Sequence, residues 1–234
     1  MIQIRIIKWS ACYLVFLFSL AYMISARGAN NSIYLTQAGS SALTLNITQT
    51  GGGNVVGTSV ARATFSGNSM TVDLDQIGTG NTLAATVAQS NSSSFTLRST
   101  GDTNTSSLTI GGTGDTASSD FDYAATGDSN ALTYVQGAAA TATSGNTDLV
   151  ITGTSNDLNI TSEVVGATNN IEIDGSSNDL DSRQTGNANH SLSLDLTGSS
   201  NNIDVDQTNA SGSISGIVDI VAVTTSGIID IDQN

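Results

Sequence analysis

Pairs of aspartates are the first residues whose type and spacing suggest chemistry. They stand two residues apart at Asp73/Asp75, Asp204/Asp206 and Asp230/Asp232. Carboxylates at this spacing share one face of a β-strand, where they can ligate a cation or act as an acid–base pair. However, each Asp alternates with an apolar residue, and the spacing matches no EF-hand loop. The pairs therefore predict a solvated, charged outer face of a sheet.

Other catalytic side chains are scarce. His190 is the single histidine, and its position between a turn and a strand predicts a solvent-exposed turn residue. The single cysteine, Cys12, stands near the N-terminus, and the chain has no Gly-x-Ser-x-Gly elbow and no phosphate-binding loop. We therefore expect no enzyme activity, no metal ion and no cofactor.

Residues 1–28 have the order of a secretory signal peptide. Basic residues precede an apolar run over Ala11–Ile24, and small residues follow it. This run of 14 residues is shorter than the ~20 that span a bilayer, so a retained membrane anchor is the weaker alternative. We expect a secreted mature chain that does not insert into a membrane. Cleavage is expected after one of three residues: Ala26, Gly28 or Ala29.

The expected mature chain is acidic and polar. Removal of residues 1–28 leaves three arginines against 20 acidic residues, a net charge of −17, and no cysteine. This charge argues against nucleic acid as a partner, and disulfides cannot stabilise the fold. Disorder is an alternative for a chain so rich in Gly, Ser, Thr and Asn. The regularly spaced β-branched and leucine residues argue against it.

A short turn motif, Gly-x-x-Asn, organises the chain as a repeat. It occurs nine times between residues 51 and 201, and two near misses at Gly39 and Gly114 carry Ala in place of Asn. Gly and Asn tolerate the backbone conformations of tight turns. The predicted turn glycines are Gly39, Gly51, Gly78, Gly101, Gly114, Gly127, Gly153, Gly166, Gly175, Gly186 and Gly198.

Short alternating segments follow most of these turns, as in "NDLNIT" from Asn156. Units of 9–13 residues between turns are too short for a crossover helix, and no sustained helical period is present. A stack of strand–turn–strand units explains why the same turn recurs. We therefore predict an all-β solenoid without helices, with repeats over residues 29–207 and degenerate rungs of the same solenoid over residues 208–234.

Carboxamide side chains share the apolar face of many predicted strands. In residues 201–207, for example, Asn201 and Gln207 lie on the face of Ile203 and Val205. An unpaired buried amide is costly, but in a stack each amide can bond to its equivalent above and below. The predicted ladder residues are Gln37, Gln49, Asn54, Gln76, Asn81, Gln89, Asn104, Asn130, Gln136, Asn156, Asn169, Asn178, Gln184, Asn189, Asn201, Gln207 and Gln233.

Three of these turns carry a longer motif, Gln-x-Gly-x-x-Asn, at residues 49–54, 76–81 and 184–189. This motif resembles the curlin repeat. The resemblance implies a β-solenoid subunit that polymerises into extracellular amyloid fibres of the biofilm matrix of Gram-negative bacteria. It also implies an outer-membrane export channel, a nucleator and periplasmic accessory proteins as partners. The chain departs from the family in its irregular spacing and in its lack of a Gly-rich leader before the first repeat.

The last residues, "GIIDIDQN", resemble an interior repeat and provide no polar cap. An open strand edge favours head-to-tail self-association. The segment 216–223 is the most apolar part of the mature chain. It is either a degenerate rung or the segment that nucleates assembly, through Ile217, Val218, Ile220, Val221 and Val223. The alternative function is a monomeric secreted solenoid that acts as an adhesin or binds a ligand or ice.

Overall fold

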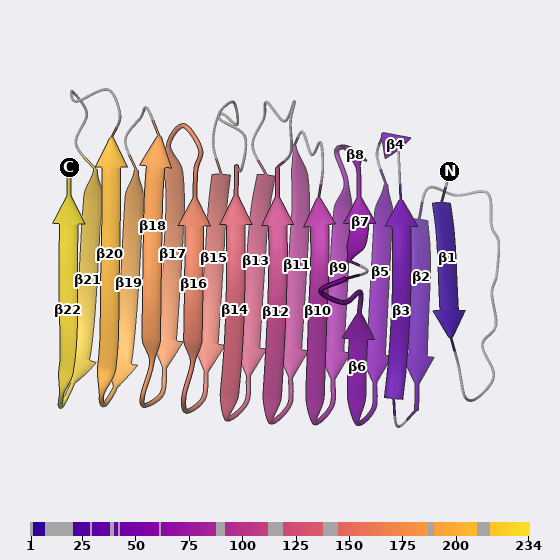
Figure 1. Cartoon of the computed structure of the whole chain (residues 1–234), viewed down its shortest axis with the longest axis horizontal. Helices are drawn as coiled ribbons and strands as arrows, with labels where there is room; N and C mark the ends of the chain where they lie inside the picture. The colour runs from indigo at the N-terminus through magenta and orange to yellow at the C-terminus, as the bar shows by residue number, and fades with distance from the viewer. Residues whose placement is uncertain are drawn as a thin grey trace.

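The chain forms a coil of stacked β-strands in the computed structural model of the full sequence (Figure 1). The structure describes residues 2–7, 21–28, 30–37, 40–41, 43–60, 62–87, 92–111, 119–137, 145–186, 190–209 and 216–234. All regular elements in these ranges are β-strands, so the prediction of an all-β solenoid is confirmed. Among the same residues, no helix is long and apolar enough to cross a membrane.

Two sheets lie face to face along the coil. The 9-stranded sheet holds, in spatial order, β2 (Ala21–Arg27), β5 (Thr44–Thr50), β9 (Thr71–Ile77), β11 (Ser93–Thr100), β13 (Ser119–Thr126), β15 (Gly145–Thr152), β17 (Ala167–Asp174), β19 (Ser191–Gly198) and β21 (Ile217–Thr224). Each of its strands is followed in the chain by a strand of the other sheet. We call such a pair, with the turn that joins it, a rung.

The second sheet has 11 strands. Its order is β1 (Ile2–Ile7), β3 (Asn30–Gln37), β6 (Gly53–Val56), β10 (Gly80–Val87), β12 (Thr103–Ile110), β14 (Ser129–Gln136), β16 (Asp157–Ser162), β18 (Asp179–Gly186), β20 (Asn201–Asn209) and β22 (Gly227–Gln233). Strand β7 (Ala63–Phe65) continues the rung of β6 and pairs with β3 and β10. A small separate sheet joins β4 (Ser40–Ser41) to β8 (Gly67–Asn68).

Successive rungs stack in parallel and in register. For example, β17 pairs with β15 and β19, and β18 pairs with β16 and β20, with no shift between equivalent residues. The exception in the described chain is β1, which pairs antiparallel with β3. Tight turns join the two sheets along one edge of the coil, and longer connections join them along the other (Figure 1).

Alternation along each strand builds a thin core between the sheets. On β17, Ile171 and Ile173 are buried, whereas Glu172 and Asp174 face solvent. A one-residue slip would exchange these faces, so the apolar pattern fixes the register. Aromatic residues fill the middle of the core, where Phe121 of one sheet stacks on Tyr134 of the other with ring centroids 4.5 Å apart. The core therefore depends on every rung keeping the same alignment.

The terminal regions extend the same stack. Residues 217–233 form one more rung, because β21 pairs with β19 and β22 pairs with β20. In the intact chain, the predicted signal peptide contributes strands at the opposite end, since β2 pairs with β5 and β1 pairs with β3. The predicted boundaries at residues 28 and 207 stay predictions.

Candidate functional site: amide columns and the terminal rung

A continuous column of asparagines runs along the tight-turn edge of the coil. In each step, the Nδ2 atom of one Asn donates to the Oδ1 atom of the next, with distances between 2.7 and 2.9 Å. The members, all buried, are Asn31, Asn54, Asn81, Asn104, Asn130, Asn156, Asn178 and Asn201. The second Nδ2 proton also finds backbone carbonyls of the turn, as in the 3.2 Å bond from Asn104 to Gly101. The column therefore satisfies amides that would otherwise be buried unpaired.

Glutamines form two shorter ladders. On the 9-stranded sheet, Gln76 Nε2 donates to Gln49 Oε1 at 2.9 Å. On the 11-stranded sheet, a second ladder lies at the strand ends opposite the tight turns. There Gln207 donates to Gln184 at 2.6 Å, and Gln233 donates to Gln207 at 2.8 Å. These bonds run from later to earlier rungs, opposite to the asparagine column. Because each Gln bonds to the equivalent Gln of the neighbouring rung, the ladders stabilise the in-register stack.

Glycines form a second column directly beside the asparagines. At Gly78 and Gly101, a Cβ atom would overlap the carbonyl oxygen of the glycine one rung earlier. The same close approach recurs at Gly51, Gly127, Gly153, Gly175 and Gly198. These glycines are needed because the backbones of successive turns touch, and any side chain would push the rungs apart.

The ladder prediction is wrong for one asparagine. Asn169 stands inside β17, where its register neighbours are Thr147 and Leu192. Its Oδ1 accepts a 3.4 Å hydrogen bond from Ser162 Oγ. The predicted turn glycines Gly166 and Gly186 lie between β16 and β17 and at the end of β18, at the edge opposite the glycine column. A local Gly-x-x-Asn motif therefore does not specify which edge of the coil it occupies.

Gln136 is buried but has Ile110 and Ser162 as its register neighbours. It therefore has no amide directly above or below it. Gln89, Asn189, Gly39 and Gly114 lie outside the described residues, as does the side chain of Gln37.

Asn31 is a ladder member that the sequence analysis missed. It donates to Asn54 at 2.9 Å and begins the column. A signal was present, because residues 28–31 read Gly-Ala-Asn-Asn, a further Gly-x-x-Asn motif. In the intact chain, Gly28 also begins the glycine column, since its carbonyl oxygen lies against Gly51. Residue 28 ends the predicted signal peptide, yet it belongs to the same column of turns.

The outer faces carry the acidic pairs. Arg98 bridges one pair, with Nη2 2.6 Å from Asp73 Oδ1 and Nε 2.7 Å from Asp75 Oδ1. On the 11-stranded sheet, Asp204 stands between Asp181 and Asp230 in register. Burial, followed by the charge of Asp204, raises the pKa of the Asp181 carboxyl.

Among the described residues, no group of His, Cys, Asp or Glu side chains is arranged to hold a metal ion.

His190 is buried, so the prediction of a solvent-exposed residue is wrong. Only 2% of the residue is exposed, because it lies directly before β19 between Ala167 and Ile217, whose backbone N–H donates to the His190 carbonyl oxygen at 2.9 Å. Its Nδ1 atom accepts a 3.2 Å hydrogen bond from the Ala167 backbone N–H, and its Nε2 atom has no partner in the described structure. Burial lowers the pKa of the imidazole.

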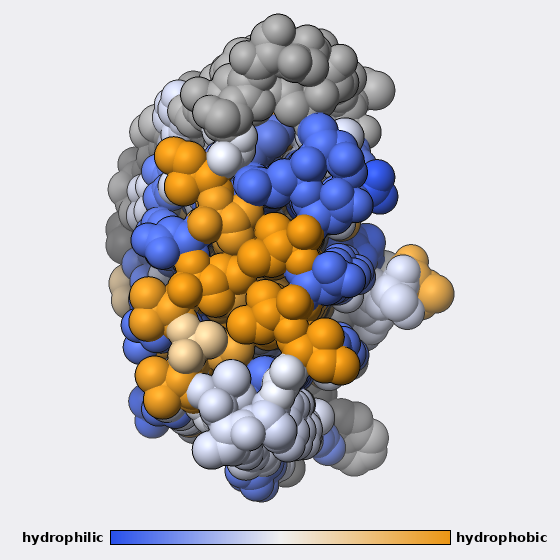
Figure 2. Space-filling view, turned by 90° about the vertical axis from the view of Figure 1, so that its left-hand side faces the viewer, coloured by the Kyte–Doolittle hydropathy of each residue, from blue (hydrophilic) through white to orange (hydrophobic). Residues whose placement is uncertain are grey.

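The terminal rung leaves the end of the core open. Val218 and Ile220 of β21 pack against the core, whereas Ile217, Val221 and Val223 are exposed. On β22, Ile229 and Ile231 occupy core columns but remain 41% and 45% exposed. Figure 2 views this end of the coil and shows apolar surface in its centre with hydrophilic residues around it. Both terminal strands thus present an unpaired edge next to an uncovered core.

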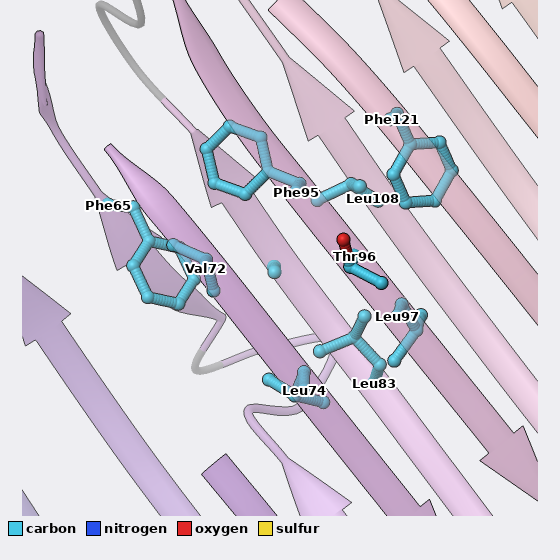
Figure 3. Close-up of a pocket in the computed structure, with 10 residues that line it drawn as sticks. Phe65, Val72, Leu74, Leu83, Phe95, Thr96, Leu97, Leu108 and Phe121 are labelled. Atoms are coloured by element: carbon cyan, nitrogen blue, oxygen red, sulfur yellow. The ribbon is translucent and has the colours of Figure 1, made fainter. Parts of the chain in front are cut away.

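A small void lies within the core between the two sheets (Figure 3). Mostly apolar side chains from β7, β9, β10, β11, β12 and β13 line it, including Phe65, Val72, Leu83 and Phe95. Its volume of about 20 Å³ is close to that of one water molecule, and an apolar void of this size stays dry. It is too small to bind an organic ligand.

No protein-family model, curated protein or solved structure matches the chain. The resemblance to curlin therefore stays a prediction that rests on the Gln-x-Gly-x-x-Asn turns.

Proposed function

We propose that this protein is a secreted structural subunit that polymerises head-to-tail into extracellular curli-like amyloid fibres. The fibres would serve in biofilm matrix, adhesion and aggregation, and subunits would leave through an outer-membrane channel with a nucleator and accessory proteins. The observation that carries the proposal is the terminal rung, where unpaired edges of β21 and β22 flank the exposed Ile229 and Ile231. Soluble proteins rarely leave such edges uncovered.

The geometry of this end favours open-ended growth. A parallel stack has different surfaces at its two ends, so contact between them is heterologous and does not close into a ring. Each added copy would continue both sheets and cover the exposed core. The Gln184–Gln207–Gln233 ladder reaches the last strand, so the register of the stack is held up to the edge where a copy would add.

Electron microscopy and fibre diffraction of the exported, processed chain test this proposal. We expect unbranched fibres that bind amyloid dyes, with reflections near 4.8 Å along the fibre and near 10 Å across it. A chain that sediments as a monomer at every concentration and never forms fibres would overturn the proposal. That result would favour the monomeric adhesin or ligand-binding solenoid.

A further inference from the structure

The first rung of the intact chain contains a strand of the predicted signal peptide. Strand β2 pairs with β5, and β3 pairs with β6 and β7. Together they cover the N-terminal end of the core, with Ile24 and Ile33 buried. Removal of residues 1–28 takes β1 and β2 away. The edge of β5 then has no partner, and β3 is left as half a rung.

The C-terminal rung carries matching residues at the same register positions. Followed from strand to strand through the 9-stranded sheet, Ile24 of β2 and Ile220 of β21 belong to one column. In the 11-stranded sheet, Ile33 of β3 and Ile229 of β22 likewise share a column. The last rung can therefore cover the apolar core at β5 and β6 as the first rung does, with Gly227 at the register position of Asn31.

We infer that the C-terminal rung of one copy replaces the β2–β3 rung of the next copy, so that β21 pairs with β5 and β22 pairs with β6 and β7. This inference rests on the proposed function, since it specifies the junction between fibre subunits. The interface continues the rung-to-rung contact that recurs inside the chain. Strand β3 of the receiving copy is displaced.

The competing junction keeps β3 in place and pairs β22 with it. In that arrangement nothing occupies the position of β2, so a gap one strand wide separates β21 from β5. The gap would leave two unpaired strand edges and expose Leu45 and Ile47, which are buried in the intact chain. Replacement of the whole rung pairs both sheets and leaves no gap.

Cysteine pairs on the outer faces distinguish the two junctions. Thr48 faces Ser25 of β2 in the intact chain, and Val221 holds the same column in the last rung, so rung replacement sets Val221 opposite Thr48. Retention of β3 would instead set Ile228 opposite Ser32. Registered positions on adjacent strands are close enough for a disulfide. The processed chain has no other cysteine, because Cys12 leaves with residues 1–28.

The test uses two double variants, Thr48→Cys with Val221→Cys and Ser32→Cys with Ile228→Cys. Each is exported, processed, assembled and oxidised. We expect fibres of the first variant to give disulfide-linked dimers and larger species on non-reducing gels, and fibres of the second to stay unlinked. Unprocessed chains that carry Cys12→Ser should not link in the first variant, because β2 still covers β5.

Limited chymotrypsin digestion of unsubstituted fibres gives a second measurement, since displaced β3 should be cut after Tyr34. Fibres that link only through the second variant and protect Tyr34 would overturn rung replacement and leave the fibre proposal intact. The absence of fibres in every variant and in the unsubstituted chain would overturn both proposals.

Discussion

Asn156 Nδ2 donates to Asn178 Oδ1 at 2.7 Å, and both side chains are buried at the tight-turn edge of the coil. Each residue also bonds to a glycine carbonyl of its own turn, at 3.1 Å from Asn156 and 3.0 Å from Asn178. One amide therefore fixes its turn and aligns it with the next. Loss of alignment would leave buried amides unpaired, at a cost of about 1–3 kcal/mol each.

Substitution of Gly101 should break the contact between turns. In Gly101→Ala, the new Cβ would overlap the Gly78 carbonyl oxygen. We expect the free energy of unfolding, measured with urea on freshly purified monomer, to fall by more than about 3 kcal/mol. Gly80→Ala is the matched control, because its Cβ would meet only the Gly52 carbonyl oxygen, at 3.7 Å. Equal effects of the two substitutions would contradict the close packing of the turns.

Assembly should depend on the inward face of β21. Ile220 packs against the core, whereas its neighbour Val221 is exposed. We expect Ile220→Asp to lengthen the lag of fibre formation several-fold, measured with an amyloid dye, because it places a charge in the surface that the next rung must cover. Val221→Asp adds the same charge to the outer face and should change the lag much less. An unchanged lag in Ile220→Asp would show that this segment does not nucleate assembly.

Acid should stabilise the stack through its carboxylates. Burial and the nearby Asp204 raise the pKa of Asp181, so the folded state binds a proton more readily than the unfolded state. The folded state therefore gains stability as the pH falls through this raised pKa. We expect faster assembly at about pH 4 than at about pH 8. Asp181→Asn should accelerate assembly at the higher pH and reduce the difference; a rate insensitive to pH and salt would contradict this prediction.

His190 should act in the opposite direction. Its pKa is lowered from 6.5 by burial, so its stabilising contribution is complete above that pH and is lost as the pH falls toward the folded-state pKa. Protonation would also remove the Nδ1 acceptor of the Ala167 N–H. The variant His190→Gln keeps a hydrogen-bond acceptor but has no titrating group. When the pH is lowered from about 7 to about 5, we expect the free energy of unfolding in urea to change more favourably in this variant than in the unsubstituted chain. Identical pH profiles would show that His190 does not titrate with unfolding.

Local patterns predicted most of the stack but not its two edges. Gln49 and Gln76 were predictable because the motif places Gln, Gly and Asn around one tight turn, and that turn recurs in register. Asn169 follows the same short motif, yet its turn lies at the opposite edge, because the register of a long-range pairing is not encoded in four residues. His190 was misjudged for a similar reason. Its burial depends on contacts with the backbone of Ala167 and Ile217 in neighbouring rungs.

Hydrogen exchange of the side-chain amides, followed by NMR, tests the stacked amide column most directly. Asn156 belongs to the column, whereas Asn159, three residues later, is exposed on the outer face of β16. We predict that the side-chain NH₂ protons of Asn156 exchange orders of magnitude more slowly than those of Asn159. Equal, rapid exchange at both residues would show that the asparagines point into water, and it would contradict the stacked amide column.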